Sequence, residues 1–500
     1  MNFQGKLFRE GMLPVYRNTQ MSHWRRIKHP IVSLETTDKG LEVTFKHTFE
    51  TNNDIVFFAF TYPWSYSDNL EFLDYLHEKV PPFVYFHRDT IAFSRENRKI
   101  ELLTISSYKG LCESEEKTIP NLFPTENPRA KRFENKPYVL ITARVHPGEN
   151  PGSFVLNGLL KYLCLPKSTD FNCMNLLDNF VFVIIPMLNP DGVYKGHYRT
   201  DPQGLNLNRF YVNPSHIEHP SIYAVKELAI YLDKRLYMYV DLHAHASKKG
   251  CFIFGNSLDY KNQVDICLFP KLLGMNSRNF DYENCDFSQK NMFAKEKGDE
   301  FSKEGCGRVG IYKATGVLYS YTLECNYNIG IHGPEVDEIE EKKLQEVWLG
   351  NKNDMNLEDS RTLEFIMGNE IKKIDYLEAS PYTIEAYEDI GKGICLSLLD
   401  LNDLNCEVPK NLRILKMNLA ANLLKKAPFR FEPALRKIMR ALTNPNEMKK
   451  ALKEIVGLIE KNRKNSENKQ KVEKEKLAIV AKNITNNANG GGLKAAQMKM

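Results

Sequence analysis

Short apolar runs alternate with longer stretches of helical spacing through the middle of the chain, from about residue 84 to residue 404. Strands that alternate with helices typically build a sheet with helices on both faces. We therefore predict an α/β domain over residues 84–404, with a mixed, mostly parallel sheet flanked by helices. One helical pattern near its end, Tyr382–Leu399, is expected to pack against that sheet.

The first 83 residues have a different pattern. Leu41–Phe49 and Asp54–Tyr62 are rich in β-branched and aromatic residues and are separated by turn-forming residues. Such runs favour short strands that pair in an antiparallel sheet. We predict that residues 1–83 form a partial antiparallel β-domain ahead of the larger one.

Three later segments are more polar. A highly charged insert is expected over about 335–373, between the strand that leads into Glu324 and the helix near 382. A helical carboxyl-terminal extension is expected over 405–460, because apolar residues recur there at helical spacing. Residues 461–500 are rich in Lys and Asn and contain Gly490–Gly492, so they predict a disordered basic tail.

Four predicted strands run directly into polar residues that could carry chemistry. Tyr138–Arg144 leads into HPGE, Val181–Leu188 into NPDG, Tyr237–Leu242 into HAH, and Leu318–Leu323 into Glu324. Ligands of open α/β sheets bind at the carboxyl ends of the strands. The four ends are therefore expected to converge on one site.

The HPGE and HAH motifs suggest a metal site. His146 and Glu149 are three residues apart at a bend, and either His243 or His245 could supply a third ligand. Two histidines and one carboxylate are a common ligand set for catalytic zinc. The alternatives are a chance HxxE pair and a buried histidine that only makes hydrogen bonds.

Further residues in this region could bind and activate a substrate. Arg199 and Arg209, with Asn208 beside the latter, could bind a carboxylate and polarise a carbonyl, although surface arginines are usually only solvated. Glu324 ends an apolar run, where an isolated carboxylate is costly to bury. It could act as a general base on a water molecule, or it could lie in solvent.

Composition excludes several classes of protein. The chain has 42% hydrophobic and 26% charged residues, which is typical of a soluble globular protein. Its apolar runs are too short for a membrane helix, so no membrane association is expected. The amino terminus lacks a secretory pattern, and ten scattered cysteines without a CxxC pair predict reduced thiols rather than structural disulfides. We expect a cytoplasmic protein, with microtubules, cilia and the nucleus all left open.

The net charge of +5 is a property of the tail. Residues 461–500 carry ten Lys and Arg against three Glu, so the first 460 residues have a net charge of about −2. A nucleic-acid-binding protein normally has a basic body. Nucleic acid is therefore not an expected partner.

Taken in order, HPGE, GHYRTD, NLNR, VDLHAH and YTLE resemble the motifs of the zinc carboxypeptidases of the M14 class, and more closely those of the cytosolic carboxypeptidases. The similarity includes FFAFTYPWSYSD at 57–68 and SKEGCGRVGIYKATGVLYSYTLECNYN at 302–328. It covers about residues 8–328 and resumes near 380–401. It is strongest to the branch that removes branch-point glutamates from polyglutamylated tubulin.

The resemblance implies roles for the matching residues. Members of this family usually carry a complete β-sandwich before the catalytic domain, of which residues 1–83 match only the later part. By this resemblance one Zn²⁺ per chain would be held by His146, Glu149 and His243, and Glu324 would be the general base. Arg199 would stabilise the oxyanion, and Asn208 and Arg209 would bind the substrate's α-carboxylate. An acidic side chain of the substrate would meet Arg308, with Lys313 as second candidate.

The implied function is a zinc metallocarboxypeptidase that hydrolyses glutamate from polyglutamate side chains of tubulin, with branch-point and linear linkages both open. The basic tail could attract an acidic tubulin tail. Two alternatives are a non-catalytic protein that binds tubulin or glutamate chains, and an M14-like amidohydrolase acting on small acyl amino acids. The oligomeric state is left open.

Overall fold

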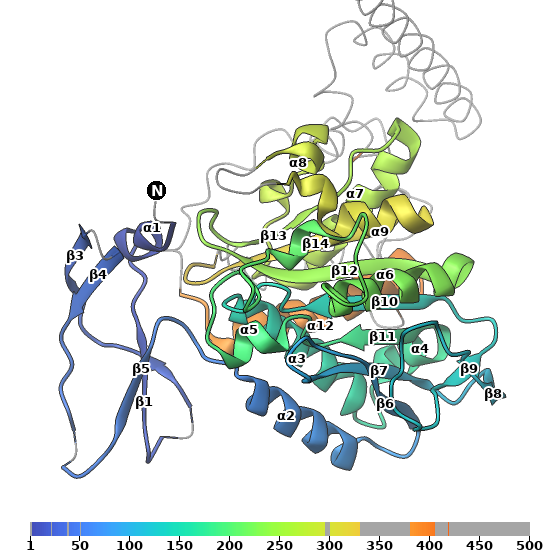
Figure 1. Ribbon diagram of the computed structural model, residues 1–500, viewed down its shortest axis with the longest axis horizontal. Helices are drawn as coiled ribbons and strands as arrows, with labels where there is room; N and C mark the ends of the chain where they lie inside the picture. Colours follow the sequence, from blue (N-terminus) through green and yellow to red (C-terminus); the bar gives the residue numbers. More distant parts are fainter. Residues whose placement is uncertain are drawn as a thin grey trace, which may run out of the picture. The chain divides into compact units, whose positions relative to one another are not determined.

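A seven-stranded mixed sheet forms the centre of the larger domain. The computed structural model describes residues 3–21, 23–37, 40–50, 52–295, 301–330, 381–405 and 419. Figure 1 labels the strands. In spatial order they are β13 (Cys251–Phe254), β14 (Tyr319–Asn326), β12 (Leu236–His245), β10 (Tyr138–Ala143), β11 (Val181–Ile185), β7 (Lys99–Ser107) and β6 (Val84–Phe93).

The strand directions confirm the predicted mixed, mostly parallel sheet. The four strands β14, β12, β10 and β11 are parallel neighbours, whereas β13 and β7 run antiparallel to them at the two sides. Strand β6 is antiparallel to β7 and so points the same way as the central four. The carboxyl ends of the four predicted motif-bearing strands therefore lie at one edge of the sheet.

Helices cover both faces of the sheet because its strands are apolar on both sides. Val139, Ile141 and Ala143 of β10 pack into one core, and Tyr138 and Leu140 pack into the other. The first face is covered by α3 (Asn150–Cys164), α4 (Phe171–Asn179), α7 (Tyr260–Asn276) and α12 (Ile384–Leu401), and the second by α6 (Pro220–Leu232) and α9 (Gly307–Thr315).

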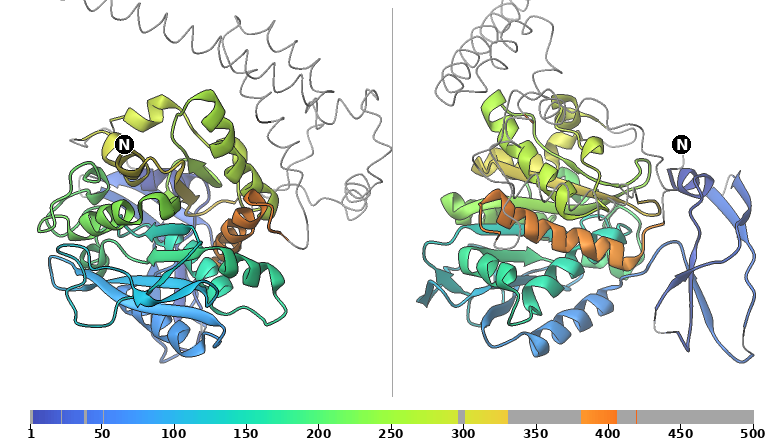
Figure 2. Two further views of the ribbon diagram at one scale, coloured as in Figure 1. Left: turned by 90° about the vertical axis from the view of Figure 1, so that its right-hand side faces the viewer. Right: turned by 180° about the vertical axis from the view of Figure 1, so that it is seen from behind.

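Helix α12 corresponds to the helical pattern expected at Tyr382–Leu399 and lies directly against α3, as Figure 2 shows in orange. Two glycines allow this close approach. A Cβ at Gly391 would lie 2.0 Å from the carbonyl oxygen of Val155, and one at Gly158 would lie 2.1 Å from that of Glu388. Any larger residue at either position would push the two helices apart.

The amino-terminal part contains the expected short antiparallel strands. One sheet has the order β2-β1-β5, and β3 and β4 pair as a separate hairpin. The elements are α1 (Phe3–Arg9), β1 (Val15–Asn18), β2 (Arg25–Arg26), β3 (Ile31–Thr37), β4 (Gly40–Phe45) and β5 (Val56–Ala59). The expected strands at 41–49 and 54–62 are thus shorter than predicted.

Helix α2 (Tyr66–Lys79) follows, and Ser65 caps it with a reciprocal capping box to Asp68. Its Leu73 and Leu76 belong to the same core as α3. The remaining elements are short: α5 (Pro190–Tyr194), α8 (Gln289–Phe293), the hairpin of β8 (Leu111–Glu115) and β9 (Lys131–Phe133), and the 3₁₀ helices η1 (Leu207–Arg209), η2 (Asp233–Arg235), η3 (Tyr282–Asn284) and η4 (Lys303–Gly305).

Two strand ends differ from the prediction. The HAH motif was expected to follow its strand, but β12 continues through His245, and Glu324 lies inside β14 rather than after it. The reason is that β12 and β14 keep pairing in parallel register as far as His245 and Asn326. Both motifs are therefore held by backbone hydrogen bonds of the sheet.

The predicted charged insert at 335–373, the extension at 405–460 and the basic tail at 461–500 lie outside the described residues, apart from Asn405 and Leu419. Every described residue belongs to one compact unit. None of the described helices combines the length and the apolar run that a membrane crossing requires. The nine cysteines within the described ranges are free.

Candidate metal centre and active site

Three buried side chains form the one group of metal-binding type within the described residues. His146 and Glu149 lie in the loop between β10 and α3, and His243 lies on the neighbouring strand β12. One ligand atom from each residue can be chosen so that all three lie within 4.8 Å of one another. The structure thus brings together the three residues that the sequence resemblance assigned to zinc.

A glycine and the segment after NPDG shape the loop that carries two of these residues. Gly148 donates a backbone hydrogen bond to the carbonyl of Tyr198 at 2.8 Å, and a Cβ on Gly148 would lie 2.7 Å from the Tyr198 ring. This contact brings the next residue, Arg199, to the cluster, where its guanidinium lies 3.8 Å from Glu149 Oε1.

The outer nitrogens of both histidines face oxygen acceptors. His146 Nε2 lies 3.0 Å from Asn206 Oδ1, and His243 Nε2 lies 2.7 Å from Asp241 Oδ2. Because an amide oxygen and a carboxylate accept hydrogen bonds, both partners favour a proton on Nε2. The Nδ1 lone pairs of both rings are then left to face Glu149, since a hydrogen bond to the outer nitrogen of a histidine orients the inner one toward a metal ion.

The inner side of the cluster fits a cation. His146 Nδ1 is buried, lies 2.8 Å from Glu149 Oε1 and makes no hydrogen bond, while Glu149 Oε2 lies 2.9 Å from His243 Nδ1. Electron-pair donors that face one another at these distances need a proton or a metal ion between them. Two imidazole nitrogens and a carboxylate match the donor set of catalytic zinc, so these residues fit the ion that the family implies.

The pKa values of His243 and Glu149 also indicate that the cluster attracts a positive charge. Burial alone would lower the pKa of His243, but the carboxylates of Asp241 and Glu149 flank its ring and raise that pKa well above its usual value. Burial alone would raise the pKa of Glu149, but the two histidines hold it well below its ordinary range. The site therefore holds an ionised carboxylate and attracts a positive charge, either a proton or a metal ion.

Glu324 lies directly opposite His243 on the adjacent parallel strand. Its side chain is partly buried. Burial, reinforced by the charge of Glu149 and opposed by that of His243, raises its pKa to about 8. A carboxyl group whose pKa is shifted by its surroundings, next to a metal cluster, is a candidate for proton transfer.

Asn208 and Arg209 lie on the short helix η1 and are both buried. Asn208 Oδ1 accepts a hydrogen bond of 3.0 Å from the amide of Gly307, the first residue of α9, and its carbonyl accepts one of 2.8 Å from Arg209. The NLNR motif is therefore connected directly to the helix that carries Arg308.

Arg308 and Lys313 have different surroundings on α9. Arg308 is only 2% exposed, its guanidinium lies over the ring of Phe254, and its hydrogen bonds go to neutral groups, the nearest being the carbonyl of Gly255 at 3.3 Å. Among the described residues no carboxylate pairs with it. Lys313, by contrast, forms an ion pair with Glu304 near the surface. Of the two candidates for an acidic side chain, Arg308 is the buried cation without a counter-ion.

Two other motif residues, His245 and Asp191, make contacts that support the fold and not the metal cluster. His245 is outside the cluster: its Nδ1 accepts a hydrogen bond of 3.0 Å from the amide of Lys248, and its ring packs on Phe252. Asp191 of NPDG is buried and accepts hydrogen bonds from Ser94 and Arg98, which tie the β6–β7 hairpin to this turn. NPDG therefore shapes the edge of the site without adding a ligand.

Sequence reasoning missed Asn206, whose Oδ1 faces His146 Nε2, and the buried Arg144, whose guanidinium donates hydrogen bonds around the HPGE loop. The signal for Asn206 was its place two residues before Asn208. For Arg144 no local signal existed, because its side chain joins the nearby Pro147 and Ser153 to Trp64, which lies 80 residues away in the sequence.

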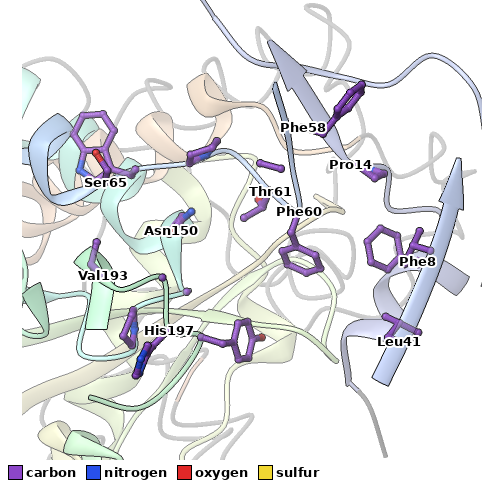
Figure 3. A pocket seen from close by; sticks show the side chains of 18 of the residues that line it. Phe8, Pro14, Leu41, Phe58, Phe60, Thr61, Ser65, Asn150, Val193 and His197 are labelled. Atoms are coloured by element: carbon purple, nitrogen blue, oxygen red, sulfur yellow. The ribbon is translucent and has the colours of Figure 1, made fainter. Parts of the chain in front are cut away.

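A cavity of about 870 Å³ lies beside the HPGE loop, and Figure 3 shows its lining. Leu41, Phe58 and Phe60 of the amino-terminal part form one side, and Pro147 and Gly148 belong to the other. None of His146, Glu149, His243 and Glu324 lines it. The cavity is therefore separate from the candidate metal centre.

Comparison with known proteins supports the family resemblance. Residues 70–247 match the family model described as zinc carboxypeptidase. Human cytosolic carboxypeptidase-like protein 5 is 33% identical over 506 residues, covering 81% of this chain and 54% of that protein. Human cytosolic carboxypeptidase 6 is 30% identical over 416 residues, covering 81% of this chain and 67% of that protein. The chain thus spans about half the length of the first of these relatives.

Solved structures share the fold. A metallo-carboxypeptidase from Burkholderia cenocepacia superimposes with a TM-score of 0.54 at 21% identity, covering 80% of this chain and 82% of that one. A carboxypeptidase described as putative from Burkholderia mallei gives 0.53 at 20% identity, with 80% of each chain covered. Together with the identities over four fifths of the chain, the matching family model places this protein in the cytosolic carboxypeptidase family of the zinc carboxypeptidases.

Proposed function

We propose that this chain is a zinc metallocarboxypeptidase that removes glutamate from polyglutamate side chains of tubulin, including the glutamate at a branch point. The observation that carries the proposal is the buried group of His146, Glu149 and His243 with Glu324 opposite His243. A protein that only binds glutamate chains has no need of a general base in that place.

The chemistry needs an activated water molecule. A zinc ion held by His146, Glu149 and His243 would polarise the scissile carbonyl and lower the pKa of a water molecule. Glu324 accepts a proton from the attacking water and later donates it to the nitrogen of the departing glutamate. Arg199, next to Glu149, neutralises the negative charge that develops on the carbonyl oxygen.

The substrate's terminal carboxylate is assigned to Asn208 and Arg209. An arginine fork binds a carboxylate with two parallel hydrogen bonds, which fixes the end of the chain relative to the reacting carbonyl. A requirement for a free α-carboxylate makes the enzyme an exopeptidase. Both linear and branch-point glutamates carry such a carboxylate.

The preference for glutamate is assigned to Arg308. A buried guanidinium that faces only neutral groups remains costly until an anion pairs with it. The side chain of a bound glutamate supplies that anion, whereas an apolar side chain leaves the charge unpaired. Asn208 accepts a hydrogen bond from the amide of Gly307, the neighbour of Arg308. The proposed site for the α-carboxylate is therefore directly connected to the proposed site for the glutamate side chain.

Tubulin as the substrate rests on the resemblance to the branch-point deglutamylases, and the cytoplasm as the location rests on the word cytosolic in the names of the relatives. Attraction between the basic residues of 461–500 and an acidic tubulin tail agrees with this choice.

The proposal is tested by incubating the purified, zinc-loaded chain with three synthetic peptides and measuring their masses. One peptide ends in linear α-linked glutamates, one carries a single γ-linked branch glutamate, and one ends in alanine. We expect loss of glutamate from the first two and little change in the third. Equal trimming of the alanine peptide would remove the glutamate preference, and no trimming of any peptide would favour the binding-only alternative.

A further inference from the structure

Arg144 has a backbone conformation that normally favours glycine. It follows β10 and precedes His146 by two residues, its φ is 59°, and its side chain is 2% exposed. A long side chain in the left-handed region is strained and persists only where the surroundings hold it. The contacts of its guanidinium are therefore the feature to explain.

The Arg144 guanidinium joins three segments of the chain. Its Nε and one terminal nitrogen donate to the carbonyl of Pro147 at 3.0 and 2.6 Å. The other terminal nitrogen donates to Ser153 Oγ at 2.9 Å and to the carbonyl of Trp64 at 3.0 Å. One side chain thus ties the HPGE loop to the first turn of α3 and to the segment that precedes α2.

The segment before α2 is itself fixed, so it can serve as an anchor. Ser65 caps α2 through the capping box, which fixes the chain next to Trp64. Asn150, the residue after Glu149, donates a second hydrogen bond across this contact, to the carbonyl of Tyr62 at 2.9 Å. The loop with two candidate ligands is therefore attached to Tyr62–Ser65 on both sides of the HPGE motif.

On the side that faces the cavity, side-chain packing among the described residues does not hold the HPGE loop in place of these hydrogen bonds. Pro147 and Gly148 line the cavity of about 870 Å³, whose opposite side includes Leu41 and Phe60 (Figure 3). Close packing normally holds a loop in place. Here the loop borders open space, so hydrogen bonds hold this side of it: those of Arg144 and Asn150 to Tyr62–Ser65, beside the bond from Gly148 to Tyr198.

We propose that Arg144 is a positioning residue that holds the HPGE loop so that His146 and Glu149 keep the spacing a zinc ion requires, and that it makes this spacing depend on the Tyr62–Ser65 segment. The inference rests on the metal centre of the proposed function but not on the identity of its substrate. It gives the amino-terminal segment a defined role, support of the metal centre.

The most informative variant is Arg144→Gly, because glycine adopts a φ of 59° without strain and the change removes only the side chain. The measurement is the zinc dissociation constant, obtained by competition with a chromophoric chelator. Loss of a group that orients metal ligands typically weakens metal binding roughly 10- to 100-fold, and we expect a rise in that range. Methylguanidinium, which fills the space left by the side chain, should restore part of the affinity.

Arg235→Gly is the control, since Arg235 is a partly buried arginine that pairs with Glu116 away from the metal centre. We expect it to lower the melting temperature and leave the zinc dissociation constant unchanged. If Arg144→Gly does not fold, Arg144→Lys carries the same test, because an ammonium keeps the charge but cannot form this fork of four hydrogen bonds.

The inference is overturned if Arg144→Gly, or Arg144→Lys in its place, lowers the melting temperature as Arg235→Gly does but binds zinc within about twofold of the wild type. A wild-type chain that trims no peptide while Arg144→Gly still weakens zinc binding would refute the proposed function and support the inference. If the wild-type chain trims the peptides and Arg144→Gly binds zinc with unchanged affinity, the proposed function is supported and the inference about Arg144 is refuted.

Discussion

His243 and Glu324 lie directly opposite each other on the adjacent parallel strands β12 and β14. The first is a candidate zinc ligand and the second a carboxylate whose pKa burial raises to about 8. Because both residues sit within paired strands, the sheet itself fixes the position of the base relative to the metal ligand. The catalytic arrangement therefore depends little on loops at this point.

His243→Ala should reduce the zinc content from one ion per chain to a small fraction, whereas His245→Ala should keep it. The reason is that His245 Nδ1 already accepts backbone hydrogen bonds outside the cluster. Metal analysis by atomic emission after dialysis measures both variants. The reverse pattern would exchange the assignments of the two histidines.

Asn206→Ala should weaken zinc binding by roughly 10- to 100-fold, the usual effect of losing the hydrogen-bond partner of a metal ligand. Asn206 Oδ1 is the acceptor that favours the proton on His146 Nε2 and leaves Nδ1 free for the metal. Asn206→Asp keeps an acceptor in place and serves as the control, with near-normal affinity expected from chelator competition. A loss of affinity in Asn206→Asp equal to that in Asn206→Ala would contradict this role.

Arg308→Ala should raise KM for glutamate-ended peptides more than for alanine-ended peptides. Removing one partner of a buried charge pair costs about 2 kcal/mol or more, which is roughly 30-fold in affinity. Lys313→Ala is the control on the same helix, because Lys313 pairs with Glu304 near the surface. An equal effect of Arg308→Ala on both kinds of peptide would reject a role in specificity.

Glu116 should make the fold sensitive to acid. Burial would raise its pKa, but hydrogen bonds from Arg235, Tyr138 and Tyr231 outweigh burial and lower the pKa below 4.5. The unfolded chain then binds the proton more readily, so this contribution to stability is present above the ordinary pKa and is lost as the pH falls through the folded value.

Urea unfolding from about pH 6 down to about pH 3 measures this effect. The wild type should lose more stability over that interval than Glu116→Gln, whose side chain does not titrate. Parallel pH profiles of the two proteins would show that Glu116 is not responsible.

Much of the architecture could be predicted because hydrophobic pattern and strand ends carry local information. The apolar runs that become β10, β11, β12 and β14 were recognisable, and each leads toward or contains a motif residue. The order of the strands in the sheet could not be predicted from the sequence, since β14 pairs with β12 although about 80 residues separate their motifs. The exact ends of β12 and β14 also escaped prediction, because mutual pairing extends both strands through polar residues.

The metal ligands could be predicted for a similar reason, since their residue types and spacing are specific to the chemistry. The supporting groups could not. Arg144 finds its partners in Trp64, Pro147 and Ser153, which come together only in the folded chain, and the choice between Arg308 and Lys313 depends on which side of α9 is buried. Such roles are properties of three-dimensional contacts.

The central claim is that Glu324 acts as the general base of a zinc carboxypeptidase acting on glutamate chains. The most direct test compares the zinc-loaded wild type with Glu324→Gln on a tubulin-tail peptide that carries one γ-linked branch glutamate, followed by mass spectrometry. The account predicts loss of one glutamate by the wild type and a rate lower by roughly 10²- to 10⁴-fold in the variant, with zinc content unchanged. Equal trimming by the two proteins, or none by the zinc-loaded wild type, would contradict it.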